Sequence, residues 1–234
     1  MSIPDRLGGA AGAGHEDSAA SARGLSEAAV SRLALCHRVL LDLAAAGVES
    51  VRSDDLAAAC GVRPANLRKD LSCLGSYGVR GVGYQVPVLL THIAEQLGLT
   101  SGVGVVIVGL GHLGRALAGY PGFTARGLTV VGLIDSAGIG DVIECPSAPL
   151  AIAGIGELDG IVQRTGARIG IIATPAASAQ QAADLLVASG VRSILNFAPA
   201  TLAVPASIEV RRVDLAVELQ ILAFHEQQRA EETA

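Results

Sequence analysis

The stretch V-G-V-V-I-V-G-L-G-H-L-G, residues 103–114, decides the fold of the larger part of the chain. Its first six residues are typical of a buried strand and run directly into three glycines spaced G-x-G-x-x-G. In this pattern Gly109 makes a tight turn, Gly111 admits a pyrophosphate and Gly114 packs a helix against the strand. The stretch predicts a Rossmann domain, a doubly wound parallel sheet that binds a dinucleotide. The loop residues between the glycines belong to the same predicted site: Leu110, His112 and Leu113.

A second buried strand, L-T-V-V-G-L-I, leads to Asp135, about 20 residues after the last of these glycines. A carboxylate at this position accepts hydrogen bonds from ribose hydroxyls. The following Ser136, Ala137 and Gly138 offer no cation for a 2′-phosphate. The sequence therefore predicts that Asp135 binds the ribose and that the ligand is NADH or NAD+ rather than NADP(H). The helix between the two strands is expected to carry Leu113, Leu117 and Tyr120.

Two later strands, which begin at Arg168 and Ser193, are expected to supply the rest of the pocket. Ligands of open α/β sheets bind beyond the carboxyl ends of the strands, so the loops that follow these strands are candidate pocket residues. Ordinary strand-to-loop capping is the alternative interpretation. The candidates are Thr174, Pro175, Asn196, Phe197, Ala198 and Pro199.

The first hundred residues show a different pattern. Apolar residues recur at helical spacing over residues 26–47, a short helix is expected from the N-cap candidate Ser53 to residue 61, and a third helix over residues 64–74. The glycine-rich segment 79–86 is typical of a β-hairpin. This order predicts a winged helix-turn-helix, in which the second helix of the pair enters the major groove of double-stranded DNA.

One face of the third helix, Leu67, Leu71 and Leu74, is predicted to be core, and the opposite face carries hydrogen-bond donors. The net charge of −5 does not exclude DNA binding, because residues 60–84 carry four basic side chains against Asp70 alone. The predicted DNA contacts, on the helix and at the tip of the hairpin, are Ala65, Arg68, Lys69, Ser72, Arg80 and Gly81.

Composition bounds the class of protein. Half of the residues are apolar and 17% are charged, which predicts a globular chain. No apolar stretch approaches the roughly 20 residues that span a bilayer, so we expect a cytoplasmic protein without a membrane partner. The four cysteines form no C-x-x-C pair, so no metal site is predicted. We expect them to be reduced, apolar side chains, with a thiol response of one exposed cysteine as the alternative.

The chain from residue 24 to residue 228 resembles the Rex family of redox-sensing repressors. The similarity rests on four segments: R-K-D-L-S-C-L-G-S-Y-G-V-R-G-V-G-Y (68–84), V-G-L-G-H-L-G-R-A-L-A-G-Y-P-G-F (108–123), I-L-N-F-A-P (194–199) and V-D-L-A-V-E-L-Q (213–220). Where the family commonly has aromatic residues, this chain has Cys36, His37, Leu71 and Cys73, which mostly changes packing and leaves the expected architecture the same.

The resemblance implies a homodimer that exchanges its C-terminal helices and reads an inverted-repeat operator. It also implies that NADH releases the DNA while NAD+ binds more weakly and competes. The last helix fits this scheme, because Leu215, Leu219, Leu222 and His225 share one stripe that needs a partner surface. From matched positions we hypothesise a switch of Arg38, Tyr120 and Asp214, in which Arg38 pairs with Asp214 in only one state.

The predicted organisation is a leader (1–24), a winged-helix domain (25–99), a Rossmann domain (100–211) and an exchanged helix with a tail (212–234). The main rival function is an NAD-dependent oxidoreductase with an appended helical domain. That enzyme would need a proton donor near the nicotinamide, and no histidine lies on a loop after the later strands of the Rossmann pattern. A winged-helix protein that has lost DNA binding is a second rival, which Arg68, Lys69 and Arg80 oppose. We therefore expect a repressor without catalytic residues.

Overall fold

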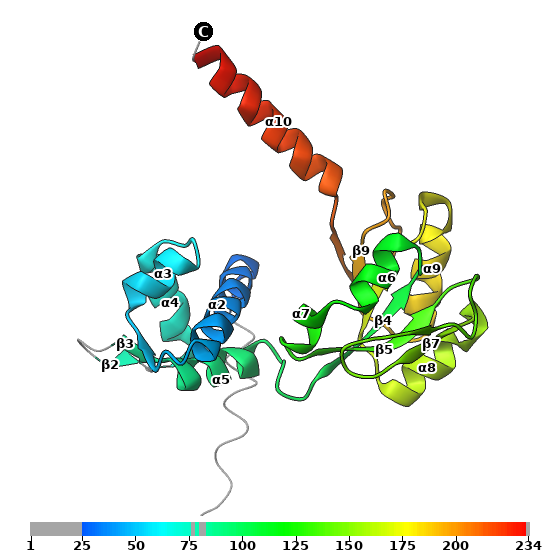
Figure 1. The fold of residues 1–234 in the computed structure, drawn as a ribbon, viewed down its shortest axis with the longest axis horizontal. Coiled ribbons are helices and arrows are strands. Elements are labelled where there is room, and N and C mark those ends of the chain that lie inside the picture. Colours follow the sequence, from blue (N-terminus) through cyan, green and yellow to red (C-terminus); the bar gives the residue numbers. More distant parts are fainter. Residues whose placement is uncertain (1–24, 76–77, 80–82, 233–234) are drawn as a thin grey trace, which may run out of the picture. The chain divides into compact units, whose positions relative to one another are not determined.

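The computed structural model describes residues 25–75, 78–79 and 83–232, in two compact units that divide between Thr100 and Ser101 (Figure 1). The predicted leader and the predicted DNA contacts Arg80 and Gly81 lie outside the described residues.

The first unit contains helices and a small antiparallel sheet, and it confirms the predicted winged helix-turn-helix. Its sheet has the strand order β1-β3-β2, in which β2 and β3 form the hairpin of the wing. The two-residue strand β1, which no sequence pattern predicted, pairs with β3. In chain order the elements are α2 (Glu27–Ala45), β1 (Ser50–Val51), α3 (Ser53–Ala59), α4 (Pro64–Leu74), β2 (Gly78–Val79), β3 (Gly83–Gln85) and α5 (Val86–Gln96).

Local chemistry sets the ends of these helices. Ser26 caps α2, because its Oγ accepts a hydrogen bond from the N–H of Ala29 at 3.3 Å. Pro64 opens α4, where its missing N–H costs nothing. The predicted N-cap Ser53 is wrong: Arg52 is extended and its carbonyl accepts the first helical bond of α3, so Ser53 is already helical. The predicted core face of α4 is confirmed, since Leu67, Leu71 and Leu74 are all buried.

The second unit is a seven-stranded sheet with helices on both faces, which confirms the predicted doubly wound fold. The strand order is β10-β9-β8-β4-β5-β7-β6, with only β6 antiparallel to its neighbour. The strands are β4 (Val103–Val108), β5 (Leu128–Ile134), β6 (Val142–Ile143), β7 (Leu150–Ala153), β8 (Ile169–Ile172), β9 (Ser193–Asn196) and β10 (Glu209–Arg212). The helices are α6 (His112–Ala118), α7 (Pro121–Thr124), the 3-10 turn η2 (Ile155–Glu157), α8 (Leu158–Thr165), α9 (Ala176–Ala188) and α10 (Leu215–Glu232).

Each face of this sheet has its own core. Val106 and Val108 pack with buried residues of α8 and α9, whereas Val105 and Ile107 pack with α6 and residues near α7. The helix after the glycines is shorter than predicted. It ends at Ala118, and Tyr120 is instead the N-cap of α7, because Pro121 starts a new helical turn.

The C-terminal helix α10 is present as predicted and buries nothing on its own chain. Every residue from 215 to 231 is exposed. Its apolar side chains are among the most exposed of the described chain, with Leu215 at 62%, Leu219 at 66% and Phe224 at 58%. The apolar side chains of α10 therefore form a face that no other described part of the chain covers.

Candidate functional site

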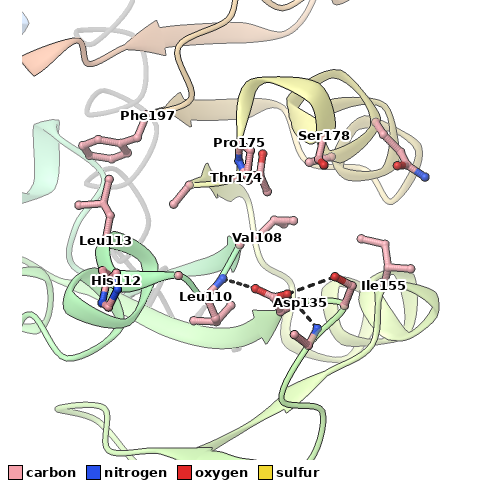
Figure 2. Close-up of a pocket in the computed structure, with 17 residues that line it drawn as sticks. Val108, Leu110, His112, Leu113, Asp135, Ile155, Thr174, Pro175, Ser178 and Phe197 are labelled. Carbon is pink, nitrogen blue, oxygen red and sulfur yellow. Dashed lines mark hydrogen bonds between the residues drawn. The ribbon is translucent and has the colours of Figure 1, made fainter. Parts of the chain in front are cut away.

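A cavity of about 870 Å³ opens at the carboxyl ends of β4, β5 and β8 (Figure 2). The glycine loop forms one side of it and the N-terminal part of α9 another, and Asp135 lies between Leu110 and Ile155, across the cavity from Ser178. Nine residues of the predicted nucleotide site line this cavity: Gly109, Leu110, Gly111, His112, Leu113, Asp135, Thr174, Pro175 and Phe197.

The glycines of the loop have three different environments. Gly109 has φ +97°, and a Cβ there would lie 2.7 Å from the carbonyl carbon of Ala173. Gly114 does not line the cavity, and a Cβ on it would lie 1.9 Å from the carbonyl oxygen of Gly109. Gly111 differs, because a Cβ would meet nothing within 4 Å. The first and third glycines are thus required by the fold, and the second leaves open space on the cavity side.

Asp135 directly follows β5 and is held by the backbone of two loops. Its carboxylate accepts hydrogen bonds from the N–H of Leu110 and, at 3.0 Å, from the N–H of Ala137. Partial burial alone would raise the pKa of Asp135, but these hydrogen bonds and those from Ser136 outweigh it and lower the pKa. The carboxylate is therefore ionised at neutral pH, and its remaining lone pairs can accept further hydrogen bonds from a ligand.

Thr174 is a wall residue of the cavity whose hydroxyl has no hydrogen-bond partner. Its Oγ1 is buried and is one of two buried side-chain atoms in the described chain without a hydrogen-bond partner. An unpaired buried hydroxyl costs about 1–3 kcal/mol, which a ligand oxygen or nitrogen would recover. The hydroxyl belongs to a residue of the cavity wall, so the polar parts of a dinucleotide fit the site.

Besides Gly114, three predicted residues do not line the large cavity. Asn196 is 1% exposed and supports the backbone: its Nδ2 donates to the carbonyl of Ala200 at 2.8 Å and its Oδ1 accepts from the N–H of Ala198 at 2.9 Å. Ala198 and Pro199 line a second cavity of about 120 Å³, whose other walls are Leu113, Phe197 and the residues at the start of α10. The loop after β9 therefore contributes Phe197 to both cavities and Ala198 and Pro199 only to the smaller one.

The structure also adds wall residues that the sequence did not predict. Ser178 and Gln181 lie in the first and second turns of α9, and Ile155 follows β7. The position of Ile155 could have been predicted had β7 been recognised, because it too follows a parallel strand. Nothing in the sequence distinguishes Gln181 from Gln180, the other glutamine of α9. The remaining unpredicted wall residues are Val108, Ser136, Ala137, Ala173 and Ala182.

The predicted donor face of α4 is exposed. Ala65, Arg68, Lys69 and Ser72 all reach solvent. Arg68 carries an exposed ion pair with Asp54 of α3, at 3.3 Å. A phosphate or base contact by Arg68 would have to replace this carboxylate.

A buried ion pair, not predicted from the sequence, fixes α4 against α2. Arg32 donates to both carboxylate oxygens of Asp70, from Nε at 2.6 Å and from Nη2 at 2.9 Å. Asp70 is 4% exposed. The hydrogen bonds to this carboxylate raise the pKa of Arg32. Such a two-point contact restricts both the position and the rotation of the helix.

The hypothesised switch residues occupy the ends of elements or an exposed face. Arg38 is exposed on α2 and Tyr120 caps α7. Asp214 accepts a hydrogen bond from Arg212 at 2.6 Å and from the N–H groups of Ala216 and Val217 at the start of α10. In this structure Asp214 therefore has an arginine partner at the end of β10, two residues before it.

Among the described residues, no cluster of three or more His, Cys, Asp or Glu side chains could hold a metal ion. No described helix has the length and apolar character needed to span a membrane.

Fold and sites together define a nucleotide-binding domain joined to a DNA-binding helix-turn-helix, and known proteins of this class match the chain. Residues 24–72 match the family model described as a putative DNA-binding protein N-terminus, and residues 101–200 match the CoA binding domain. The chain is 53% identical to the redox-sensing transcriptional repressor Rex of Streptomyces coelicolor, over 92% of this chain and 83% of the relative. It is 42% identical to Rex of Desulforamulus reducens, over 86% and 95% of the two chains.

Solved structures agree. RSP, a Rex-family repressor, in complex with β-NAD+ and operator DNA superposes with a TM-score of 0.77 at 29% identity, covering 89% of this chain and 95% of that one. RSP in complex with β-NADH gives a TM-score of 0.76 at 28% identity, covering 90% and 99%. The chain belongs to the Rex family of redox-sensing transcriptional repressors. The rival prediction of an oxidoreductase is therefore rejected in favour of a regulator.

Proposed function

We propose that this chain binds an operator through α4 and the wing, binds NADH or NAD+ in the large cavity, and releases the operator when NADH binds. The observation that carries the proposal is the combination, in one chain, of an exposed donor-bearing α4 with a cavity that contains the glycine loop, Asp135 and the unpaired Thr174 hydroxyl. Solved relatives of the family hold these ligands, operator DNA among them.

Each part of the cavity has a distinct task in this proposal. Asp135 accepts hydrogen bonds from a ribose, the backbone at Gly111 lets the pyrophosphate approach, and Thr174 donates to a polar atom of the ligand. Phe197 and Leu113 form the apolar end of the cavity nearest the start of α10. The dinucleotide supplies the nicotinamide ring, whose oxidised or reduced state is the signal.

The DNA side of the proposal assigns two kinds of contact. Arg68 and Lys69 neutralise phosphates or bind guanine edges, while Ala65 and Ser72 lie on the same exposed face. Arg80 and Gly81 of the wing contact the adjacent backbone or minor groove. A homodimer, joined through the exposed apolar face of α10, reads the two halves of an inverted repeat in the cytoplasm.

The deciding experiment is fluorescence anisotropy of a labelled inverted-repeat duplex at fixed salt, titrated with the protein and then with NADH, NAD+ or NADPH. We expect tight binding that NADH reverses, with NAD+ and NADPH less effective. Coupling between the two sites should be about 1–3 kcal/mol, the usual range, and DNA should weaken NADH binding by the same factor. DNA binding that no nucleotide alters would contradict the proposal.

A further inference from the structure

Two cysteines of the DNA-binding unit form a buried dithiol. Cys36 lies on α2 and Cys60 is the C-cap of α3, and their Sγ atoms are 3.0 Å apart, with Cys60 donating a hydrogen bond to Cys36. Cys36 is fully buried and Cys60 is 7% exposed. Both pack in one apolar cluster with leucines of α2, α3 and α4. Neither side chain takes part in the proposed nucleotide or DNA contacts.

The geometry is close to that of a disulfide. An S–S bond measures about 2.05 Å, so the two sulfur atoms need to approach by roughly 1 Å. The two other cysteines have different settings. Cys145 is buried in the second unit, and Cys73 is exposed on α4. The pairing is specific to Cys36 and Cys60 because only these two thiols are placed in direct contact among the described residues.

We propose that Cys36 and Cys60 form a reversible disulfide when the protein meets hydrogen peroxide, which gives the DNA-binding unit a redox-active site separate from the nucleotide cavity. The cross-link joins α2 to the end of α3, immediately before the turn that leads into α4. Peroxide oxidises this pair of cysteines, and small thiols reduce the resulting disulfide. This reaction does not depend on the proposed binding of NADH or DNA.

The chemistry balances with peroxide as the oxidant. The Cys60 sulfur, as thiolate, attacks one peroxide oxygen; an S–O bond forms, the O–O bond breaks, and hydroxide leaves and takes up a proton as water. The Cys36 sulfur then attacks the Cys60 sulfenic acid; the S–S bond forms, the S–O bond breaks, and a second water leaves with the Cys36 proton. In sum, two thiols and one peroxide give one disulfide and two waters.

The order of these steps follows from the surroundings of the two sulfurs. Burial raises the pKa of both thiols, and most strongly that of Cys36. At Cys60 the hydrogen bond shared with Cys36 and the nearby Arg38 guanidinium oppose this rise. Cys60, which is also the more accessible, therefore reacts first. Because both pKa values are raised, the thiolate is scarce and the oxidation is slow compared with that of an exposed, activated cysteine.

The test begins with the reduced protein, which is treated with hydrogen peroxide. The protein is then denatured in the presence of an alkylating agent, which labels free thiols, and is analysed by mass spectrometry. We expect a product that has lost two hydrogens and escapes alkylation at Cys36 and Cys60, a non-reduced peptide pair that contains both, and full recovery with dithiothreitol. The cross-link constrains the unfolded chain, so the midpoint of thermal unfolding should rise after oxidation.

Matched variants separate the pair from the other thiols. Cys36→Ala and Cys60→Ala should each abolish the cross-linked peptide and the rise in midpoint, whereas Cys73→Ser should keep both. Circular dichroism before oxidation checks that each variant is folded. If Cys36→Ala does not fold, Cys60→Ala alone provides the test, because Cys60 lies at the edge of the core. The proposal would be overturned if Cys36 and Cys60 were fully alkylated after peroxide treatment of the folded protein. It would also be overturned if either cysteine were linked only to Cys73.

Discussion

At the scale of single residues, the second and third glycines of the glycine loop have opposite steric requirements. Gly114 is closely packed against the backbone at Gly109, whereas a side chain at Gly111 would point into open space. Substituting alanine at each position therefore separates folding from ligand binding within one motif.

We predict that Gly114→Ala lowers the midpoint of thermal unfolding, because its Cβ would clash with the carbonyl oxygen of Gly109. Gly111→Ala should leave that midpoint unchanged and weaken NADH binding, since the new methyl group occupies space that the pyrophosphate requires. Differential scanning fluorimetry and an NADH fluorescence titration measure the two effects. Equal NADH affinity of Gly111→Ala and the wild type would show that the pyrophosphate does not pass this residue.

Asp135 gives a second prediction at this scale. Asp135→Asn should weaken NADH binding roughly 10- to 100-fold, because a hydrogen bond to a charged group contributes about 1.5–3 kcal/mol. Asp141→Asn is the matched control, as its carboxylate is exposed and pairs only loosely with Arg115 at 3.8 Å. Isothermal titration calorimetry with NADH compares the two, and a similar loss in both variants would contradict the assignment.

The same carboxylate contributes to stability with a defined pH dependence. The folded-state pKa of Asp135 lies below the ordinary value of 3.8, so its contribution is fully present above that value. It is lost as the pH falls through the lowered folded-state pKa. Urea unfolding from pH 7 down to pH 3 should therefore show a smaller acid loss of stability in Asp135→Asn than in the wild type.

At the scale of elements, α4 makes two charged contacts. The Arg32–Asp70 pair fixes its position, and the Asp54 carboxylate occupies its exposed Arg68. Removing the buried contact with Arg32→Ala leaves Asp70 with an uncompensated charge and should lower the free energy of unfolding by roughly 2 kcal/mol, less than for a fully buried pair because Arg32 is partly exposed. Chemical denaturation measures this loss. An unchanged unfolding free energy would mean that packing alone positions α4.

Removing the exposed contact between Asp54 and Arg68 should strengthen DNA binding. Asp54→Ala frees Arg68 and removes a carboxylate beside the proposed DNA contact, so operator affinity should rise roughly two- to fivefold at low salt. Asp55→Ala is the matched control. A decrease in affinity with Asp54→Ala would assign the carboxylate a supporting role for Arg68.

Elements with strong local signals could be predicted from the sequence, and those without them could not. The proline at the start of α4 and the glycine loop after β4 fix their surroundings through backbone geometry alone. The two-residue strands β1 and β6 have no periodicity to detect, and they exist because a partner strand is already in place. The Arg32–Asp70 pair joins positions far apart in the sequence, so only the packing of α2 against α4 reveals it.

At the scale of the whole molecule, the predicted site was found in part because strand ends are predictable and side-chain direction is less so. Thr174 and Phe197 line the large cavity, as expected for residues after β8 and β9. Asn196 follows the same rule and yet turns its amide to the backbone of the next loop. Its role depends on a local turn that hydropathy does not encode.

The coupling between the two sites gives a prediction for the entire chain. Asp214→Ala removes the carboxylate that caps α10 and pairs with Arg212, and should change operator affinity or its response to NADH. Glu218→Ala, an exposed carboxylate on the same helix, should change neither. Anisotropy titrations with and without NADH compare them. If Asp214→Ala behaves as the wild type in both respects, the proposed switch is wrong.

The bare apolar face of α10 makes the concentration of the chain a variable of its own. A helix that finds no cover on its own subunit gains stability only by mass action with another surface. Leu219→Glu should therefore give a monomer in size-exclusion chromatography with light scattering, while Glu226→Ala should not. For a regulator that acts as the proposed homodimer, the number of copies in the cell sets a threshold below which paired half-sites are not occupied, whatever the nucleotide ratio.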